Sequence, residues 1–254
     1  MKKYIIMKTL KDKIAVITGG NSGIGYATAK VLKEQGASVI ITGRRKEAID
    51  AAARELGVSG LVADQGKLSA IEHLVRTIKE DFGAVDILFI NAGIYAGSDI
   101  EHTTEELFDG IMNVNFKGAY FTLSRFIPIL NDGSSVVLLS SNTASMNTAT
   151  ASVYSSSKAA LNSIMKIAAV ELAPRKIRVN AVSPGPIETD LLKKQGLSEE
   201  QVLGIKEWII DRVPLHHMGS AIDIGKMVAH LSSTESSFIT GSEFIMDGGM
   251  SLIG

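Results

Sequence analysis

The chain has 254 residues, a formal net charge of -1 and no cysteine. Apolar residues make up 45% of it and charged residues 21%, which is the composition of a globular protein with ample material for one large core. The lack of cysteine excludes disulfides, thiolate catalysis and Cys-ligated metals, and the evenly mixed charges include no basic arm or acidic tail for nucleic acid or an anionic membrane.

Strand-like and helix-like stretches alternate along the chain. Short runs rich in apolar and β-branched residues predict strands at 13–18, 37–42, 58–63, 85–90, 135–139, 177–182 and 242–246. Apolar residues at helical spacing predict helices at 23–35, 46–56, 69–82, 107–130, 154–172, 198–212 and 222–232. This alternation predicts an α/β fold, a single-domain doubly wound (Rossmann-type) parallel sheet of about seven strands with helices on both faces, over residues 1–254.

No stretch of the sequence predicts a membrane span, because no run reaches the roughly 20 apolar residues that a spanning helix needs. The apolar run near the N-terminus is shorter than the ~7–15 residues of a signal-peptide core. We therefore expect no membrane partner and a cytoplasmic location.

A glycine-rich turn follows the first strand. It reads Thr18-Gly19-Gly20-Asn21-Ser22-Gly23-Ile24-Gly25 and leads directly into the first helix. Glycine lets the chain turn tightly and lets a phosphate approach the backbone, while the helix N-terminus offers unpaired N–H groups to a pyrophosphate. The turn therefore predicts a dinucleotide site, the alternative being an ordinary glycine-rich loop. Its spacing, Gly19-x3-Gly23-x-Gly25, differs from the G-x-G-x-x-G fingerprint and indicates another branch of dinucleotide binders.

The end of the second strand indicates which nicotinamide cofactor binds. NAD binders carry an acidic residue there for the ribose 2′-hydroxyl, but this strand ends in Gly43-Arg44-Arg45. Arginine offers planar donors and a fixed positive charge to a 2′-phosphate. The sequence thus predicts NADP(H), held by Arg44 and next by Arg45. The alternative is that both are solvated arginines at a helix start.

Tyr154 and Lys158 lie four residues apart at the start of a predicted helix, so their side chains share one face. A neighbouring ammonium favours the phenolate, and we expect Lys158 to lower the pKa of Tyr154 toward neutrality. Such a phenol can exchange a proton with a substrate oxygen. Ser141 follows the strand at 135–139, where its hydroxyl can hold that oxygen. The alternative is a buried tyrosine with a surface lysine, and a turn at Ser141.

With these residues the chain resembles the short-chain dehydrogenase/reductase family, in its compact single-domain branch. The glycine turn matches the cofactor motif of the family, and Ser141, Tyr154 and Lys158 match its catalytic serine, tyrosine and lysine in type, order and spacing. Four further segments match as well: Asn91-Ala92-Gly93, Asn115, Asp64, and Pro184-Gly185-Pro186-Ile187-x-Thr189.

The resemblance implies a role for each of these residues. Tyr154 is the general acid/base, Lys158 lowers its pKa and binds the nicotinamide ribose, Ser141 orients the substrate oxygen, and Asn115 holds a relay water. Asp64 faces the adenine, and the stretch from Pro184 and Gly185 to Ile187 and Thr189 contacts the nicotinamide amide and the diphosphate. The resemblance also implies a substrate lid at about 187–212 and a homodimer or, more often, a homotetramer.

The stretch 142–153 is small, weakly polar and uncharged, which favours a neutral ketone, aldehyde or secondary alcohol as substrate. A 3-oxoacyl-[acyl-carrier-protein] reductase is the alternative. A non-catalytic NADP-binding regulator is a second alternative of another class, which the Ser141, Tyr154 and Lys158 set disfavours, and an isomerase or dehydratase is disfavoured by the chain length. The five histidines lack the neighbouring ligands of a metal site, so we expect no metal.

Overall fold

The computed structural model describes residues 9–189 and 198–253. Seven of its strands form one sheet: β1 Ile14–Thr18, β2 Ser38–Gly43, β3 Ser59–Val62, β4 Val85–Ile90, β5 Leu130–Leu139, β6 Arg178–Pro184 and β9 Glu243–Met246. The α-helices are α1 Gly23–Glu34, α2 Lys46–Leu56, α3 Leu68–Asp81, α4 Glu105–Met112, α5 Ala119–Phe126, α6 Ser152–Glu171, α7 Glu199–Asp211 and α8 Ala221–Ser232.

The strands run parallel in the order β3-β2-β1-β4-β5-β6-β9. The chain builds outward from β1 to β3 on one side and then from β4 to β9 on the other. Between β1 and β4 the strand order therefore reverses, and doubly wound sheets bind ligands beyond the carboxyl ends of their strands at such a point. The predicted fold class is confirmed.

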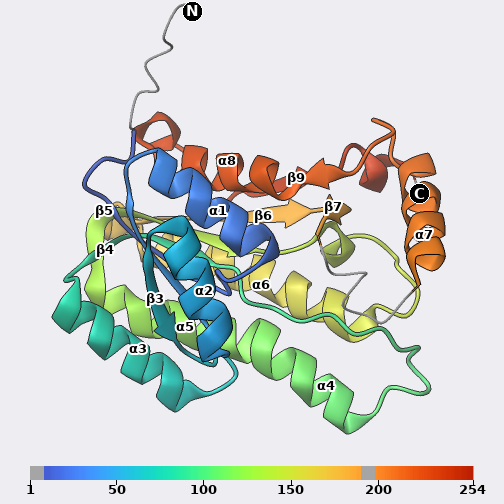
Figure 1. Ribbon diagram of the computed structural model, residues 1–254, viewed down its shortest axis with the longest axis horizontal. Helices are drawn as coiled ribbons and strands as arrows, with labels where there is room; N and C mark the ends of the chain where they lie inside the picture. The colour runs from blue at the N-terminus through green and yellow to red at the C-terminus, as the bar shows by residue number, and fades with distance from the viewer. Residues whose placement is uncertain (1–8, 190–197, 254) are drawn as a thin grey trace, which may run out of the picture.

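Two apolar cores cover the two faces of the sheet. On one face, α1, α2 and α8 pack on strand residues such as Ile17, Ile41 and Phe89. On the other, α3, α5 and α6 pack on their neighbours in the same strands, including Val16, Ile40 and Leu88. Successive strand residues point to opposite faces, so strands buried on both faces read as continuous apolar runs. Figure 1 shows α1 and α2 in blue and α8 in red on one side of the sheet, and the green and yellow helices on the other.

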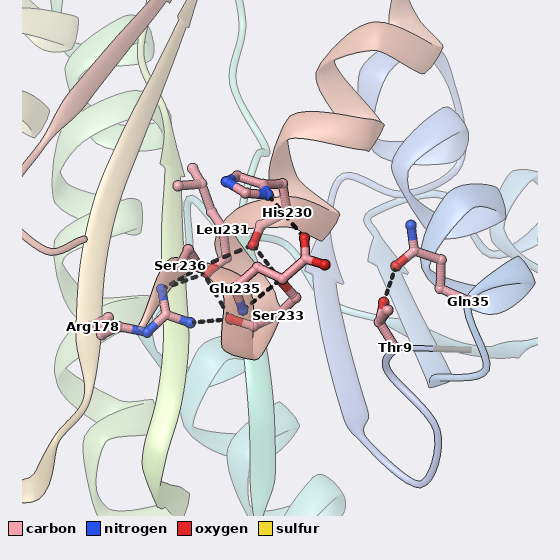
Figure 2. Close-up of polar contacts among 8 residues, drawn as sticks. All are labelled: Thr9, Gln35, Arg178, His230, Leu231, Ser233, Glu235 and Ser236. Atoms are coloured by element: carbon pink, nitrogen blue, oxygen red, sulfur yellow. Dashed lines mark hydrogen bonds and ion pairs between the residues drawn. The ribbon is translucent and has the colours of Figure 1, made fainter. Parts of the chain in front are cut away.

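The end of α8 is held by Arg178, which begins β6. Its guanidinium donates to the carbonyl oxygens of Leu231 (2.6 Å) and Ser233 (3.2 Å) and to Ser236 Oγ (2.9 Å). Burial lowers the pKa of Arg178. Figure 2 shows this side chain directed at Leu231, in the last turn of α8, and at Ser233, which follows the helix. A cation at a helix C-terminus satisfies the unpaired carbonyls and the helix dipole together.

The prediction of one long helix over 107–130 is wrong. The helix starts at Glu105, and α4 and α5 are separated by a π-helix, η1 Asn113–Gly118. It closes in the short 3-10 turn η2 Ile127–Ile129, where Pro128 removes a helical donor, and Leu130 already belongs to β5. The register between β4 and β5 shifts after Leu130, so the polar residues 131–134 bulge from the strand rather than form a free loop.

Smaller elements complete the fold. A two-stranded ladder joins β7 Ile187–Glu188 to β8 Gly219–Ser220. The remaining short turns are η3 Asn142–Ala144, η4 Ala173–Arg175, η6 Thr234–Ser236 and η7 Met250–Leu252. Helix α7 lies at one end of the molecule (Figure 1), and none of its residues is buried. Residues 190–197 of the predicted lid lie outside the described residues.

Candidate active site

The turn after β1 has the geometry that a phosphate cradle requires. Gly19 and Gly23 adopt φ values of +67° and +57°, which residues with side chains rarely adopt. A Cβ on Gly25 would lie 2.3 Å from the carbonyl oxygen of Gly19, so the first turn of α1 packs directly on the loop. The Asn91 side chain fixes the loop by donating to the carbonyls of Thr18 (2.8 Å) and Gly19 (3.0 Å). Ser22 is the N-cap of α1 but makes no side-chain cap bond, which leaves its hydroxyl for another partner.

A cavity of about 570 Å³ extends from this turn along the carboxyl ends of the strands. It is bounded by the glycine turn, the ends of β2, β3 and β4, and the start of α6. Fourteen of the predicted site residues line it: Gly19, Asn21, Ser22, Gly23, Ile24, Arg44, Arg45, Asp64, Asn91, Ala92, Gly93, Tyr154, Lys158 and Thr189. The predicted residues that do not line this cavity are Gly25, Asn115, Ser141, Pro184, Gly185 and Ile187.

Arg44 and Arg45 lie at one end of the cavity, after β2. Both are exposed, and neither side chain makes an ion pair or hydrogen bond within residues 9–189 and 198–253. The next cation, Lys46, is instead paired with Asp50 at 2.6 Å, one turn along α2. The Asn21 side chain lies against Gly43 at this end, because a Cβ on Gly43 would be 2.9 Å from Asn21 Oδ1. The cavity therefore ends at two uncompensated guanidinium groups beside amide and hydroxyl side chains.

Tyr154 and Lys158 lie at the other end, on the first turns of α6. The Lys158 ammonium nitrogen is 5.7 Å from the centroid of the Tyr154 ring and donates to the carbonyl oxygen of Leu139 at 2.8 Å. Ser141 Oγ accepts hydrogen bonds from Thr143 N (3.3 Å) and Thr143 Oγ1 (3.0 Å). Its own proton is therefore free for the side-chain hydrogen bond that joins Ser141 to Tyr154. The geometry brings the three residues together.

Asn115 is fully buried behind this group, in the π-helix η1. Its amide binds both backbone groups of Ile94: Oδ1 accepts from the N–H at 2.8 Å, and Nδ2 donates to the carbonyl at 2.9 Å. A Cβ on Gly93 would lie 3.3 Å from Asn115 Oδ1 and 3.4 Å from Lys158 Nζ. Gly93 thus lies between the two side chains, and its lack of a side chain lets both approach the cavity.

The expected direction of the Tyr154 pKa shift is wrong for the protein without cofactor. Burial raises the pKa of Tyr154, the Ser141 hydrogen bond opposes that rise, and the neighbouring Tyr95 phenol adds to it. Burial also lowers the pKa of Lys158 to about 8, because a lysine that is 3% exposed loses the hydration of its charge. Spacing along a helix predicts that two side chains are neighbours, but it does not predict how much water remains around them.

The Pro184-Gly185 stretch ends β6 beside the cavity. A Cβ on Gly185 would lie 2.4 Å from Asp247 Cβ, so this glycine allows the turn after β9 to pack on the stretch. Ile187 pairs with Gly219 and lines a second cavity, of about 450 Å³, instead of the first. Thr189, at the end of the described stretch, reaches the first cavity.

Among the cavity residues that the sequence did not single out are Tyr95 and Gln65. Tyr95 packs edge-on against the Tyr154 ring, with centroids 5.0 Å apart and an interplanar angle of 82°. Gln65 is 8% exposed and donates to two backbone carbonyls in the cavity wall. Each follows a residue already singled out at the carboxyl end of a strand, Gly93 or Asp64, and that position was the available signal.

Comparison with known proteins agrees with this geometry. A family model described as enoyl-(acyl carrier protein) reductase matches residues 19–251. The oxidoreductase asL5 of Sarocladium schorii is 36% identical, covering 97% of this chain and 99% of the relative. The NADP-dependent (R)-specific alcohol dehydrogenase of Lentilactobacillus kefiri is 34% identical, covering 94% and 97%. The chain belongs to the short-chain dehydrogenase/reductase family. It is therefore an oxidoreductase by descent.

A solved structure gives the same result for the fold. The blue fluorescent protein from a metagenomic library, solved in complex with NADPH, superposes with a TM-score of 0.87 at 28% identity and covers 95% of this chain and 99% of that one. Within the described residues, no group of three or more histidine, aspartate or glutamate side chains is placed to hold a metal ion. No described helix is long and apolar enough to cross a membrane.

Proposed function

We propose that this short-chain dehydrogenase/reductase, acting as one domain, transfers a hydride between NADP(H) and a neutral carbonyl or secondary alcohol, with Tyr154 as general acid/base. One observation carries the proposal: a single cavity has two uncompensated arginines at one end and the Tyr154 and Lys158 pair at the other. Its volume of about 570 Å³ is within the roughly 300–1,000 Å³ of small-molecule sites.

The residues present fit a dinucleotide. The glycine turn and the α1 N-terminus offer N–H groups to the pyrophosphate, and Asp64 faces the cavity as a partner for an amino group. Arg44 and Arg45 supply positive charge where a 2′-phosphate needs it, and no acidic residue ends β2 to repel that phosphate. The NADPH complex of the similar solved structure and the NADP dependence named for the bacterial relative support this choice of cofactor.

The bound nicotinamide supplies a hydride to the carbonyl carbon, or accepts one from the alcohol carbon. In reduction, the Tyr154 phenol gives its proton to the carbonyl oxygen, and the product is the alcohol; oxidation reverses both transfers. Ser141 holds the substrate oxygen in line with the phenol. Lys158, which would lie beside the cofactor ribose, stabilises the phenolate by its positive charge, and Asn115 positions the segment behind it.

An acyl-carrier-protein substrate is the second candidate, because the matching family model is described by that substrate class. It requires a basic surface for the acidic carrier close to the Tyr154 end of the cavity. The stretch 142–153, which joins the carboxyl end of β5 to the start of α6 on the Tyr154 side, carries no cation. A neutral small molecule remains our first choice, and a carrier-bound thioester belongs in the substrate panel.

We further propose a homo-oligomer, a tetramer or a dimer, in the cytoplasm. Phe108 of α4, Tyr120 of α5, and Ile167 and Val170 of α6 are exposed apolar side chains on one helical layer. Their burial against a second copy would remove apolar surface from water. Light scattering after gel filtration measures the number of copies directly.

The test is a fluorescence titration with NADPH and with NADH, followed by absorbance at the nicotinamide band with a carbonyl panel. We expect tighter binding of NADPH and turnover that the Tyr154→Phe variant loses. Arg44→Asp should weaken NADPH binding by about 10–100-fold, the equivalent of one charge-assisted contact, while NADH binding changes little. Arg54→Asp, the same charge change at the far end of α2, is the matched control.

Preference for NADH in the wild-type protein would contradict the cofactor assignment. Tight NADPH binding without turnover of any carbonyl or thioester would favour a non-catalytic regulator instead.

A further inference from the structure

Gln65 occupies an unusual place for a long polar side chain. It is 8% exposed, directly follows Asp64 after β3, and contributes to the wall of the cavity. Nothing in the proposed hydride transfer uses it. A buried carboxamide is expensive unless its donors and acceptors are satisfied, so its contacts indicate what it does.

The carboxamide joins two separate segments of the cavity wall. Its Nε2 donates to the carbonyl oxygen of Ala92 at 2.9 Å and to that of Val114 at 3.2 Å. Ala92 belongs to the Asn91-Ala92-Gly93 segment after β4, and Val114 to the π-helix η1. Both N–H bonds of the amide are therefore used, while Oε1 has no partner among the described residues.

The backbone around Gln65 strengthens this connection. Asn113 Nδ2, also in η1, donates to the carbonyl oxygen of Gly66 at 3.2 Å. At the other end of η1, a Cβ on Gly118 would lie 2.2 Å from the carbonyl oxygen of Gln65, so the helix and the 64–66 loop are in direct contact. The π-helix is thus attached to the 64–66 loop at three points: at the start of the helix through Asn113, at Val114 through the Gln65 side chain, and at the end of the helix through Gly118.

The π-helix carries Asn115, whose amide holds both backbone groups of Ile94. A π-helix is a rare, locally wide turn that is frequent at functional sites. The Gln65 carboxamide makes one hydrogen bond to this π-helix, at Val114, and one to Ala92, in the same segment whose Ile94 the Asn115 amide holds.

We propose that Gln65 is a positioning residue: its carboxamide holds the π-helix against the 92–94 segment and so keeps Asn115 and Lys158 in register at the Tyr154 end of the cavity. The expected effect of Gln65 on the reaction rate rests on the proposed function. Its expected effect on the π-helix does not depend on that function. The residue acts through Asn115 and touches neither substrate nor the reacting atoms.

The first readout does not depend on activity. Hydrogen exchange of the purified protein is compared for wild type, Gln65→Met, which keeps the length without the donors, and Asn113→Ala, which removes the neighbouring contact from a half-buried site. We expect amides of residues 113–118 and 92–95 to exchange at least about fivefold faster in Gln65→Met, and by a smaller factor in Asn113→Ala. Gln35→Met, at a surface contact with Thr9 (Figure 2), is the control and should leave both segments unchanged.

The second readout is kinetic, with NADPH and the best carbonyl of the panel. Gln65→Met should lower kcat about threefold to tenfold, leave the NADPH Kd within about twofold, and shift the pH profile of kcat, because Asn115 and Lys158 lose their alignment. A raised NADPH Kd with unchanged kcat would instead make Gln65 a cofactor contact and overturn the proposal. So would unchanged exchange in residues 113–118 in both variants. A wild-type protein with no NADPH turnover would refute the proposed function, and the exchange data would still decide the role of Gln65.

Discussion

Replacing Lys158 by methionine should stabilise the cofactor-free protein while removing its activity. Burial lowers the pKa of this lysine from 10.5 to about 8, so the folded state disfavours its charged form. That difference corresponds to about 3 kcal/mol at pH 7, at ~1.4 kcal/mol per pKa unit. Methionine keeps the packing but leaves the Leu139 carbonyl without its donor, which costs about 1 kcal/mol. The net gain is about 2 kcal/mol, or a rise in Tm of roughly 4–8 °C for a chain of this size.

The gain in stability from Lys158→Met should decrease as pH rises. The folded pKa lies below the unfolded one, so the penalty is complete below pH 8 and disappears as pH rises toward 10.5. At pH 9.5 it is smaller by about 2 kcal/mol, and the advantage of Lys158→Met is close to zero.

Urea unfolding of both proteins at pH 7 and pH 9.5 measures this difference. Lys166→Met, on the exposed side of the same helix, should show no pH-dependent gain. Two results would contradict the burial penalty at Lys158: a Lys158→Met protein less stable than wild type at pH 7, or a stability gain over wild type that is the same at both pH values.

Three further outcomes are expected. Gly25→Ala places a methyl group 2.3 Å from the Gly19 carbonyl, so we expect a loss of about 2–4 kcal/mol in unfolding free energy, and NADPH binding should weaken as well; unchanged affinity would show that the turn is not the phosphate site. Arg178→Met removes the charged donor that the Leu231 and Ser233 carbonyls share, while both keep a hydrogen bond from Ser135 Oγ or Ser236 Oγ, so the unfolding free energy in urea should fall by about 1–2 kcal/mol; a loss below ~0.5 kcal/mol would mean that the hydroxyls and water replace the guanidinium. Ser141→Ala removes the hydrogen bond that lowers the pKa of Tyr154, so the pH profile of alcohol oxidation, which needs the phenolate, should move to higher pH, and a shift to lower pH would contradict this.

Much of the fold could be predicted because its signals are local. Each sheet strand is a short apolar run, and α2 was predicted with its observed bounds, Lys46–Leu56, since Gly57 ends it in a left-handed conformation. The π-helix could not be predicted: it widens one turn of a helix without altering the polarity of its residues. The strands β7 and β8 are each two residues long, which is too short to show the alternation of apolar and polar residues that predicts a strand.

The site was predictable where function depends on residue type and spacing. Tyr154 and Lys158 share a helix face, and Ser141 lies beside them, as the sequence indicated. The pKa of Tyr154 was not predictable, because burial arises from distant segments such as the one that carries Tyr95. Gln65 was missed for a related reason: its contacts with Ala92 and Val114 span 27 and 49 residues of sequence.

The most direct test of the account follows a deuterium atom. NADPH carrying deuterium at both C4 positions of the nicotinamide is incubated with the protein and the best carbonyl substrate, and the product alcohol is examined by mass spectrometry. The account predicts one deuterium on the new alcohol carbon, and almost no product from a Tyr154→Phe variant that binds NADPH as tightly as wild type. Product without deuterium, or a Tyr154→Phe variant as fast as wild type, would contradict hydride transfer with Tyr154 as the proton donor.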